Sequence, residues 1–322
     1  MDQNCTQARL AARIRRLIKT TPVSLLTIFT APKPFADPHI ATIQRNAIQS
    51  WLHLGPEVEV LLVGEEAGIA EVASEYGVKQ LPDVRRNKSG TPLVSSIFDL
   101  ARRTSQAPLL TYINADVMLL PFFVESARRT SQQLERFLLI GQRWDLDVPQ
   151  PLDFSPGWDQ RLVVAARQRG RLHLPAGSDY FTFPRDLFIE MPDFAIGRAG
   201  WDNWMIYYAL QQSWPVVDGT PSIMVIHQDH DYSHLPGGRP HYELPESQQN
   251  TFLAGGSSNL YMVLDSNKQL IQNRIRNPRP TLMRGLRRIE TRLAPPGSLR
   301  KGMRWSLARQ ARRMRRRMTG SL

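Results

Sequence analysis

The chain has 322 residues, which is enough for one large domain or two modest domains with a substantial core. Its 42% hydrophobic and 22% charged residues exclude a disordered chain. No run approaches the roughly 20 consecutive apolar residues of a membrane-spanning helix. A single cysteine, Cys5, excludes a disulfide framework and a cysteine-rich zinc module. The apolar run 23–31 contains Ser24 and Thr27 and leads into prolines, so it predicts a buried strand rather than a signal peptide, and a cytoplasmic protein.

The formal net charge of +12 is concentrated at the two ends of the chain. Residues 274–322 contain 16 Lys and Arg against one acid, Glu290, and residues 1–19 contain five bases against Asp2. These ends carry +15 and +4, which leaves −7 on the body between them. A protein that reads nucleic acid with its folded body usually carries positive charge on that body, so this distribution disfavours nucleic acid as a partner.

The first half of the chain alternates between strand and helix patterns. Apolar residues Ile40, Ile43, Ala47 and Trp51 recur at helical spacing, and Gly77 ends the next helical pattern. This alternation is typical of βαβ units and predicts an α/β fold built on a parallel sheet. We expect strands at 23–29, 58–64, 78–82 and 108–120, and helices at 40–52, 69–76 and 92–103.

From about Phe122 the pattern becomes mixed, and after about Asn277 it becomes strongly basic. There, apolar residues recur at helical spacing among arginines in two segments separated by Pro295 and Pro296. They are Leu282, Leu286, Ile289 and Leu293, then Leu299, Met303, Leu307, Ala311, Met314 and Met318. Before them we expect helices at 122–135, at 158–169 and from residue 201, and strands at 136–144, 178–184, 215–219 and 222–228. The pattern predicts one domain over 20–273 and a basic amphipathic helical tail over 274–322.

The string YINADVML is the most informative motif. An apolar strand delivers Asn114 and Asp116, two residues apart, to the same side of the strand end. A carboxamide and a carboxylate in this arrangement suit an oxygen-ligated cation such as Mg²⁺ or Mn²⁺. The alternative is a strand-end turn in which both side chains make only local hydrogen bonds.

This string resembles the Asp-x-Asp motif of nucleotide-diphosphate-sugar glycosyltransferases with the GT-A fold, with Asn114 in the first position. The resemblance covers roughly residues 24–234. It implies a GT-A (Rossmann-like) mixed sheet flanked by helices, and transfer of a sugar from a nucleotide-diphosphate donor, with a UDP-sugar as first choice. It also implies a Mn²⁺ or Mg²⁺ cofactor whose principal ligand is Asp116, because Asn is a weaker, neutral ligand.

The resemblance assigns nucleotide-binding roles to two loops. The loop after the first strand is where GT-A enzymes hold the nucleobase and ribose, and the basic loop RRNKSGTP suits a uracil-like base or the diphosphate. The alternative for the basic loop is a solvated surface turn. The implied residues are Thr30, Ala31, Lys33, Arg86, Asn87 and Lys88.

The string GRAGWDNWMIYYAL resembles the loop and helix that carry the general base of many inverting GT-A enzymes. Asp202 is the matching carboxylate, and Trp201 and Trp204 would stack on the acceptor sugar. The alternative is a helix N-cap with both tryptophans in the core. The string GSDYFTFP resembles the acceptor-side strand of the family, which implies that Asp179 contacts the acceptor.

The string VIHQDHDYSH follows a late strand, where many GT-A enzymes add a histidine to the metal. His227 is the first expected ligand and His230 the second. Two histidines at this spacing also suit zinc in a nucleotide-sugar metallohydrolase, and a structural loop is the remaining alternative. The literal Asp-x-Asp at Asp145 and Asp147 is a reserve metal or acceptor site.

The basic tail has three interpretations: docking to an anionic membrane surface, which we favour, binding to RNA or DNA, and a disordered or partner-docking tail. We expect a metal-assisted, inverting glycosyltransferase of polysaccharide biosynthesis that acts on a glycan or lipid-linked acceptor at the cytoplasmic face of the membrane. The competing class is a non-catalytic arginine-rich protein that binds membranes or nucleic acid. A transferase requires Asp116, Asp202 and the histidines to converge on one rim of the sheet, whereas a binding module does not.

Overall fold

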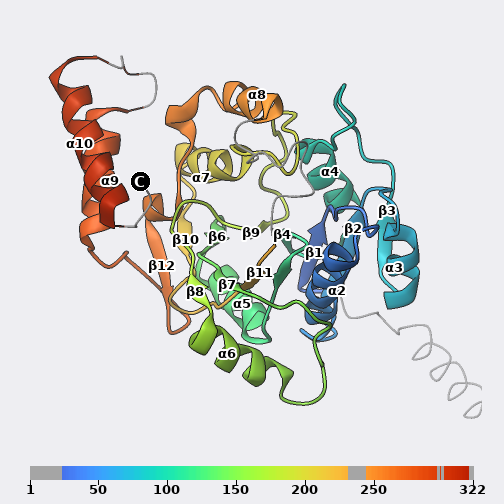
Figure 1. The fold of residues 1–322 in the computed structure, drawn as a ribbon. Helices are drawn as coiled ribbons and strands as arrows, with labels where there is room; N and C mark the ends of the chain where they lie inside the picture. The colour runs from blue at the N-terminus through green and yellow to red at the C-terminus, as the bar shows by residue number, and fades with distance from the viewer. Residues whose placement is uncertain (1–23, 231–243, 296–297, 299–300, 319–322) are drawn as a thin grey trace, which may run out of the picture.

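The computed structural model describes residues 24–230, 244–295, 298 and 301–318 (Figure 1). Its central feature is a mixed sheet, which in the described chain has the strand order β13-β12-β10-β6-β9-β4-β1-β2-β3. Cys5, the domain start expected at Thr20, and Asp231 and His234 of the histidine-rich string lie outside the described residues. The expected α/β class with a mixed sheet is confirmed.

The strands of the main sheet are parallel at one end and mixed at the other. β1 lies between β2 and β4, all three parallel, and β9 runs antiparallel between β4 and β6. β10 runs parallel to β6 and β12, and β13 is antiparallel to β12. The strands are β1 (Leu26–Thr30), β2 (Val58–Val63), β3 (Lys79–Leu81), β4 (Leu109–Ile113), β6 (Leu138–Ile140), β9 (Tyr180–Pro184), β10 (Val216–Asp218), β12 (Lys268–Ile271) and β13 (Arg274–Arg276).

Helices cover both faces of this sheet (Figure 1). Neighbouring residues of a strand point to opposite faces, so Ile28 and Phe29 of β1 enter two different hydrophobic clusters. Trp51 of α2 and Phe123 of α5 belong to the first cluster, and Phe98 of α4 belongs to the second. Strands buried on both faces read as continuous apolar runs, which is why the sequence located them. The helices are α2 (Pro38–Leu52), α3 (Ile69–Tyr76), α4 (Val94–Thr104), α5 (Phe122–Gln133), α6 (Trp158–Arg169) and α7 (Trp201–Gln211).

Local end signals explain most helix boundaries. The Asp37 side chain caps α2 by accepting a hydrogen bond from the Ile40 N–H at 2.9 Å, and α3 ends at Gly77, whose φ of 64° suits glycine. α4 begins after Leu93 rather than at Pro92, because Leu93 is extended and bridges to Ala195. The short elements β8 (Arg171–Leu172), α8 (Pro245–Leu253), η3 (Ser257–Asn259), η4 (Val263–Asp265), β12 and β13 were not predicted.

Two expected strands are each divided in two. The run 108–120 forms β4 and then β5 (Val117–Met118), because a turn closed by a 3.1 Å hydrogen bond from Val117 N–H to Asn114 O interrupts it. The run 136–144 likewise yields β6 and then β7 (Trp144–Leu146). The released segments form a second sheet of order β5-β11-β7-β8, in which β11 (Ile226–Gln228) lies between β5 and β7. This small sheet therefore brings three distant segments to the end of β4.

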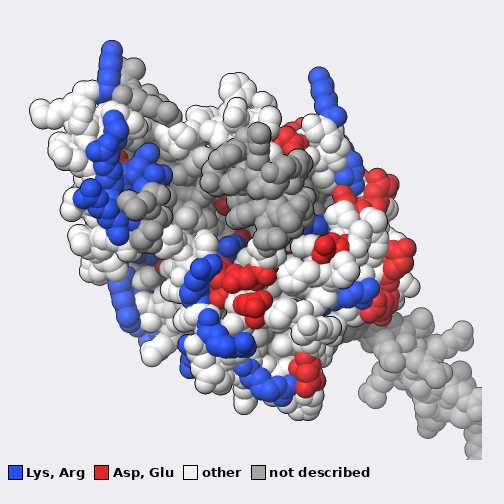
Figure 2. Space-filling model, viewed as in Figure 1, with Lys and Arg blue, Asp and Glu red and all other residues white. Residues whose placement is uncertain are grey.

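The basic C-terminal segments form the two expected helices, α9 (Leu282–Leu293) and α10 (Gly302–Met318). The domain boundary expected after Asn273 falls in the turn of the β12–β13 hairpin, so the main sheet continues past it. Basic side chains gather over α9 and α10, as Figure 2 shows. Among the described helices, none combines the length and the apolar character required to traverse a bilayer.

Candidate active site

A cavity of about 890 Å³ opens where β1, β4 and β11 end and β9 begins, beside the start of α7. Its wall brings together most of the residues that the sequence singled out, from six separate segments. Thr30, Asn87, Lys88 and Trp204 do not line it. The predicted residues that do are Ala31, Lys33, Arg86, Asn114, Asp116, Asp179, Trp201, Asp202, His227 and His230.

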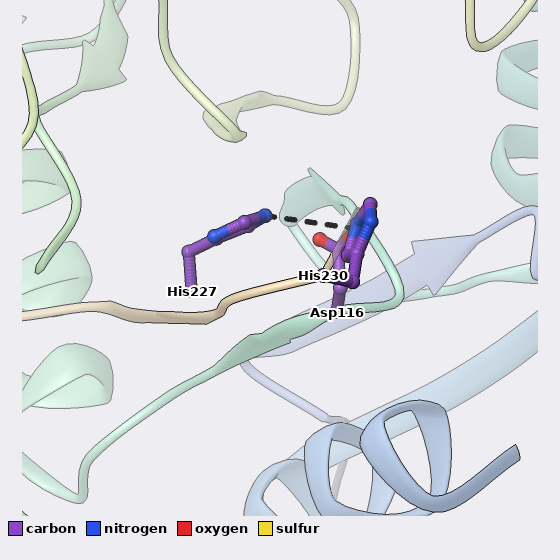
Figure 3. A group of neighbouring side chains, drawn as sticks. All are labelled: Asp116, His227 and His230. Atoms are coloured by element: carbon purple, nitrogen blue, oxygen red, sulfur yellow. Dashed lines mark hydrogen bonds and ion pairs between the residues drawn. The ribbon is translucent and has the colours of Figure 1, made fainter. Parts of the chain in front are cut away.

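Asp116, His227 and His230 form the most plausible cation site of the described residues (Figure 3). Asp116 stands in the turn before β5, and His227 on β11 pairs directly with Val117 of β5. The Asp116 Oδ2 atom lies 3.1 Å from His230 Nε2 and 3.9 Å from His227 Nε2. Asp116 Oδ1 is buried without a hydrogen-bond partner, which is what a carboxylate oxygen awaiting a cation would show. Two imidazoles and a carboxylate are a suitable donor set for Mn²⁺ and also for Zn²⁺.

The electrostatics of this site favour an ionised Asp116. Burial alone would raise its pKa, but His227, the hydrogen bond from His230 and the charge of Lys33 outweigh burial and hold the pKa well below its usual range. Burial lowers the pKa of Lys33, and the opposite charge of Asp116 counteracts this. The site therefore offers a permanent anion beside a cation that is itself poorly solvated.

Asp145 lies behind the site rather than forming a separate one. β7 and β11 are parallel and pair Asp145 with His227, and the Asp145 Oδ1 atom lies 3.4 Å from His227 Nδ1. Asp145 also accepts hydrogen bonds from Arg143 Nε at 2.9 Å and from His173 Nδ1 at 2.8 Å. Asp147 is exposed and does not line the cavity, so this Asp-x-Asp does not converge on one ligand.

A second triad of Asp145, His227 and Asp229 also has metal-ligand spacing. It shares His227 with the first triad but uses the other ring nitrogen, Nδ1. Arg143 and His173 already satisfy the Asp145 carboxylate, whereas Asp116 retains an unpartnered oxygen. Of the two groups, the one with Asp116 is therefore the better candidate for a cation site, and Asp145 lies where a carboxylate could orient a metal-binding histidine.

The Asn114 side chain is engaged with protein neighbours. Its Nδ2 atom donates to Asp179 Oδ1 at 2.8 Å, and its Oδ1 atom accepts from the Tyr112 hydroxyl at 3.3 Å. Asp179 is in turn paired with Arg143 Nη1 at 2.7 Å. Asn114 thus links the end of β4 to the ion pair of Asp179 and Arg143 in the cavity wall. This agrees with the alternative in which the Asn114 side chain makes local hydrogen bonds.

Asp202 occupies the first turn of α7 and faces the cavity. Burial and, to a smaller extent, the negative charge of Asp179 raise its pKa to about 6. Backbone hydrogen bonds, including one from the Gly200 N–H at 3.2 Å, oppose this rise. A carboxylate with this pKa is ionised at neutral pH and more basic than an ordinary aspartate, which suits a general base. Gly177 approaches so closely that a Cβ there would lie 2.9 Å from Asp202 Oδ2.

The two tryptophans of α7 are largely core residues. Trp201 packs edge-on against Tyr112 with ring centroids 5.0 Å apart, and only its margin reaches the cavity. Trp204 stacks on Tyr208 with centroids 4.7 Å apart and lies away from the cavity wall. Trp204 is therefore a core residue and does not stack on an acceptor sugar in this cavity. The helix turns its ring toward the second hydrophobic cluster.

Of the two loops expected to bind the nucleotide, the first lies at the cavity, whereas the second reaches it only in part. The first is clamped at the cavity by Gln44, whose side chain accepts from the Lys33 N–H at 2.7 Å and donates to the Lys33 carbonyl at 3.0 Å. Thr30 is a buried strand residue and contributes no cavity surface. Asn87 instead orders its own turn, accepting from the Ser89 and Thr91 N–H groups. Lys88 is exposed, as a solvated turn predicts.

Several cavity residues were not singled out from the sequence, and four of them carry ionisable side chains that face the site: Glu66, Arg143, His173 and Arg198. Glu66 pairs with Arg86 Nη1 at 2.8 Å, and its Oε2 atom is buried without a partner. Its position directly after β2, in GEE, was an available signal, because polar residues at carboxyl strand ends line ligand crevices. Arg198 lies inside the string GRAGWDNWMIYYAL, from which only Asp202 and the tryptophans were singled out. Arg143 and His173 join the cavity only through the folded chain.

No family model and no curated protein matches this chain. Among solved structures, the chain is similar to glucosyl-3-phosphoglycerate synthase from Mycobacterium tuberculosis in complex with phosphoglyceric acid, at 17% identity over 74% of this chain and 80% of that chain, with a TM-score of 0.45. The same enzyme in complex with Mg²⁺ and uridine-diphosphate gives 17% identity over 73% and 80%, with a TM-score of 0.43. A mannosyltransferase from Pyrobaculum calidifontis in complex with GDP-Man and Mn²⁺ gives 12% identity over 70% and 65%, with a TM-score of 0.40.

Proposed function

We propose that this protein is a glycosyltransferase that uses a nucleotide-diphosphate-sugar donor with the help of a divalent cation. The observation that carries the proposal is the convergence of Asp116, His227, His230 and Asp202 on one cavity. Such convergence is what a transferase needs and what a purely arginine-rich binding protein does not need.

The cation site supports the departure of the nucleoside diphosphate. Asp116, His227 and His230 would hold Mg²⁺ or Mn²⁺, which supplies positive charge to the leaving diphosphate. Lys33 and Arg86 line the same cavity and add positive charge from the protein. The poorly solvated ammonium of Lys33 interacts more strongly with a phosphate oxygen than an exposed lysine would.

Asp202 takes the role of general base in this proposal. It accepts the proton of the acceptor hydroxyl while that oxygen bonds to the anomeric carbon and the bond from that carbon to the diphosphate breaks. A single displacement of this kind inverts the anomeric configuration. Proton NMR of the first product reports this configuration directly, and retention would remove Asp202 from the role.

The donor that we favour is a UDP-sugar. Glu66 offers a buried, unpartnered carboxylate oxygen at the edge of the cavity, where an N–H group of a nucleobase would satisfy it. Arg86 holds the other oxygen of the same carboxylate and fixes its orientation. The acceptor that we propose is a glycan or a lipid-linked glycan, as part of polysaccharide biosynthesis.

The test is the thermal stability of the purified chain with UDP, GDP or CMP, each with and without Mn²⁺. A ligand at about 100 times its Kd stabilises a protein by about 2.7 kcal/mol, which a thermal shift detects. We expect stabilisation by UDP that requires Mn²⁺ and that Asp116→Ala abolishes. Failure of every nucleotide to stabilise the chain would refute the proposal. Release of free sugar in water, with no transfer to any acceptor, would instead identify a nucleotide-sugar metallohydrolase.

A further inference from the structure

The C-terminal helices α9 and α10 form a hairpin on the β12–β13 side of the molecule (Figure 1). Glu290 near the end of α9 contacts Arg312 at 2.7 Å and Arg315 at 3.1 Å, in the second half of α10. The two helices therefore pack against each other. α10 packs chiefly on α9 and places the small side chains Ala308 and Ala311 in that contact.

The inner side of the hairpin is held to the body by buried ion pairs. Arg284 Nη2 lies 2.6 Å from Asp218 Oδ2, and Arg287 Nη2 lies 2.8 Å from Asp265 Oδ2. Glu290 is the only acid in residues 274–322. Its side chain is 2% exposed, and its carboxylate is paired with arginines of the two helices. These contacts fix the position of the hairpin and leave its outer surface without acidic groups.

The outer side of the hairpin is apolar. Half of the large apolar side chains that are exposed in the described chain belong to these two helices. Arg284 and Arg287 lie on the side of α9 that contacts the body of the protein, and Leu282 and Ile289 lie on the opposite side. On α10 the spacing of the exposed residues places them along one flank. They are Leu282, at 63% exposure, and Ile289 on α9, with Met303, at 79%, Leu307, Met314 and Met318 on α10.

Exposed arginines stand beside these apolar residues on both helices. Figure 2 shows Lys and Arg side chains gathered over this part of the molecule. Arg288 and Arg292 stand on α9, and Arg309, Arg313 and Arg317 stand on α10. An apolar row between basic rows is the pattern of helices that lie in the plane of a membrane interface, where the arginines meet anionic headgroups. From this surface we infer that the α9–α10 hairpin docks the protein onto an anionic lipid bilayer.

The charge of the hairpin argues for a lipid surface over the other occupants. A second copy of the hairpin would place arginine rows against each other with no exposed acid to pair with them. Nucleic acid would neutralise the arginines, but it would leave the Leu, Ile and Met row exposed to water. A bilayer accommodates both features at once. The inference uses no residue of the cavity and stands independently of the proposed reaction.

The test uses the full chain and sedimentation with vesicles of phosphatidylcholine alone or with about 30% phosphatidylglycerol. We expect binding to the anionic vesicles only, weakened by added salt. The double variant Met303→Ser/Leu307→Ser should reduce the partition coefficient at least about tenfold, because it removes two inserted side chains. The matched control, Ile189→Ser/Phe252→Ser, removes two side chains that are 68% and 75% exposed elsewhere and should bind as the parent does.

Three results would overturn the inference. The first is equal vesicle binding by the hairpin variant and its control. The second is equally tight binding to neutral vesicles. The third is a dimer, measured by light scattering, that the hairpin variant alone dissociates, since this would assign the surface to a second copy. Nucleotide-dependent thermal shifts of the same variants should match the parent, so failure here is distinct from failure of the proposed reaction.

Discussion

Replacing Asp202 by Asn should stabilise the fold at neutral pH while removing activity. Burial raises the pKa of Asp202 from its ordinary value of 3.8 to about 6, so the folded protein binds this proton more tightly than the unfolded chain does. Ionisation of Asp202 therefore lowers the free energy of unfolding, and this loss grows as the pH rises from about 4 to above 6. A tenfold change in a dissociation constant is about 1.4 kcal/mol, so the full cost is about 2–3 kcal/mol after partial solvent screening.

Asn imitates the neutral acid and can still accept the hydrogen bond from the Gly200 N–H. We expect Asp202→Asn to raise the free energy of unfolding by about 2–3 kcal/mol at pH 7.5 and by close to nothing at pH 4, measured by urea denaturation at several pH values. Asp147→Asn, at an exposed position, is the matched control and should show no such pH dependence. An Asp202→Asn variant that is destabilised equally at both pH values would refute the reasoning.

The same substitution should lower kcat by about 10²–10⁴, because Asn cannot take a proton from the acceptor. In the parent protein, kcat/KM should fall as the pH drops below about 6, where Asp202 becomes protonated. A stabilised but inactive variant separates loss of the base from loss of the fold. Activity that survives Asp202→Asn undiminished would exclude this residue as the base.

Three further predictions concern the support of the site and of the hairpin. Asp145→Asn should weaken Mn²⁺ binding by about 10–100-fold, measured by calorimetry, whereas Asp147→Asn should not change it. Glu66→Gln should weaken nucleotide binding about tenfold or more without changing the affinity for Mn²⁺ alone, and an unchanged nucleotide Kd would remove Glu66 from base recognition. Arg284→Met should cost about 3–5 kcal/mol of stability, because it leaves the Asp218 carboxylate buried and unpaired, and Arg284→Met/Asp218→Leu should recover much of this in urea denaturation.

The sequence predicted the elements whose signals are local. α2 was located from its apolar spacing and α3 from the glycine that ends it, because each signal lies within or directly beside the element. The strand predicted at 108–120 was wrong in one respect. Five buried residues precede Asn114 and four follow Asp116, and they conceal a turn that only a hydrogen bond reveals. That turn is what points Asp116 into the cavity.

A site residue could be predicted from the sequence when its role depends on its own segment of the chain, and not when it depends on pairing with a distant segment. Asp116 and Asp202 were found because a strand end and a helix start are readable in sequence, and each residue lines the cavity from such an end. The role of Asp145 was not readable, because it depends on the pairing of β7 with β11, two segments far apart in the chain. Its Asp-x-Asp spacing suggested a ligand pair, but alternate residues of a strand share a face only while the strand continues, and β7 ends at Leu146. A motif at a strand end therefore specifies a metal site only together with the neighbouring strand that supplies the remaining ligands, and in the site that we propose this strand is β11 with His227.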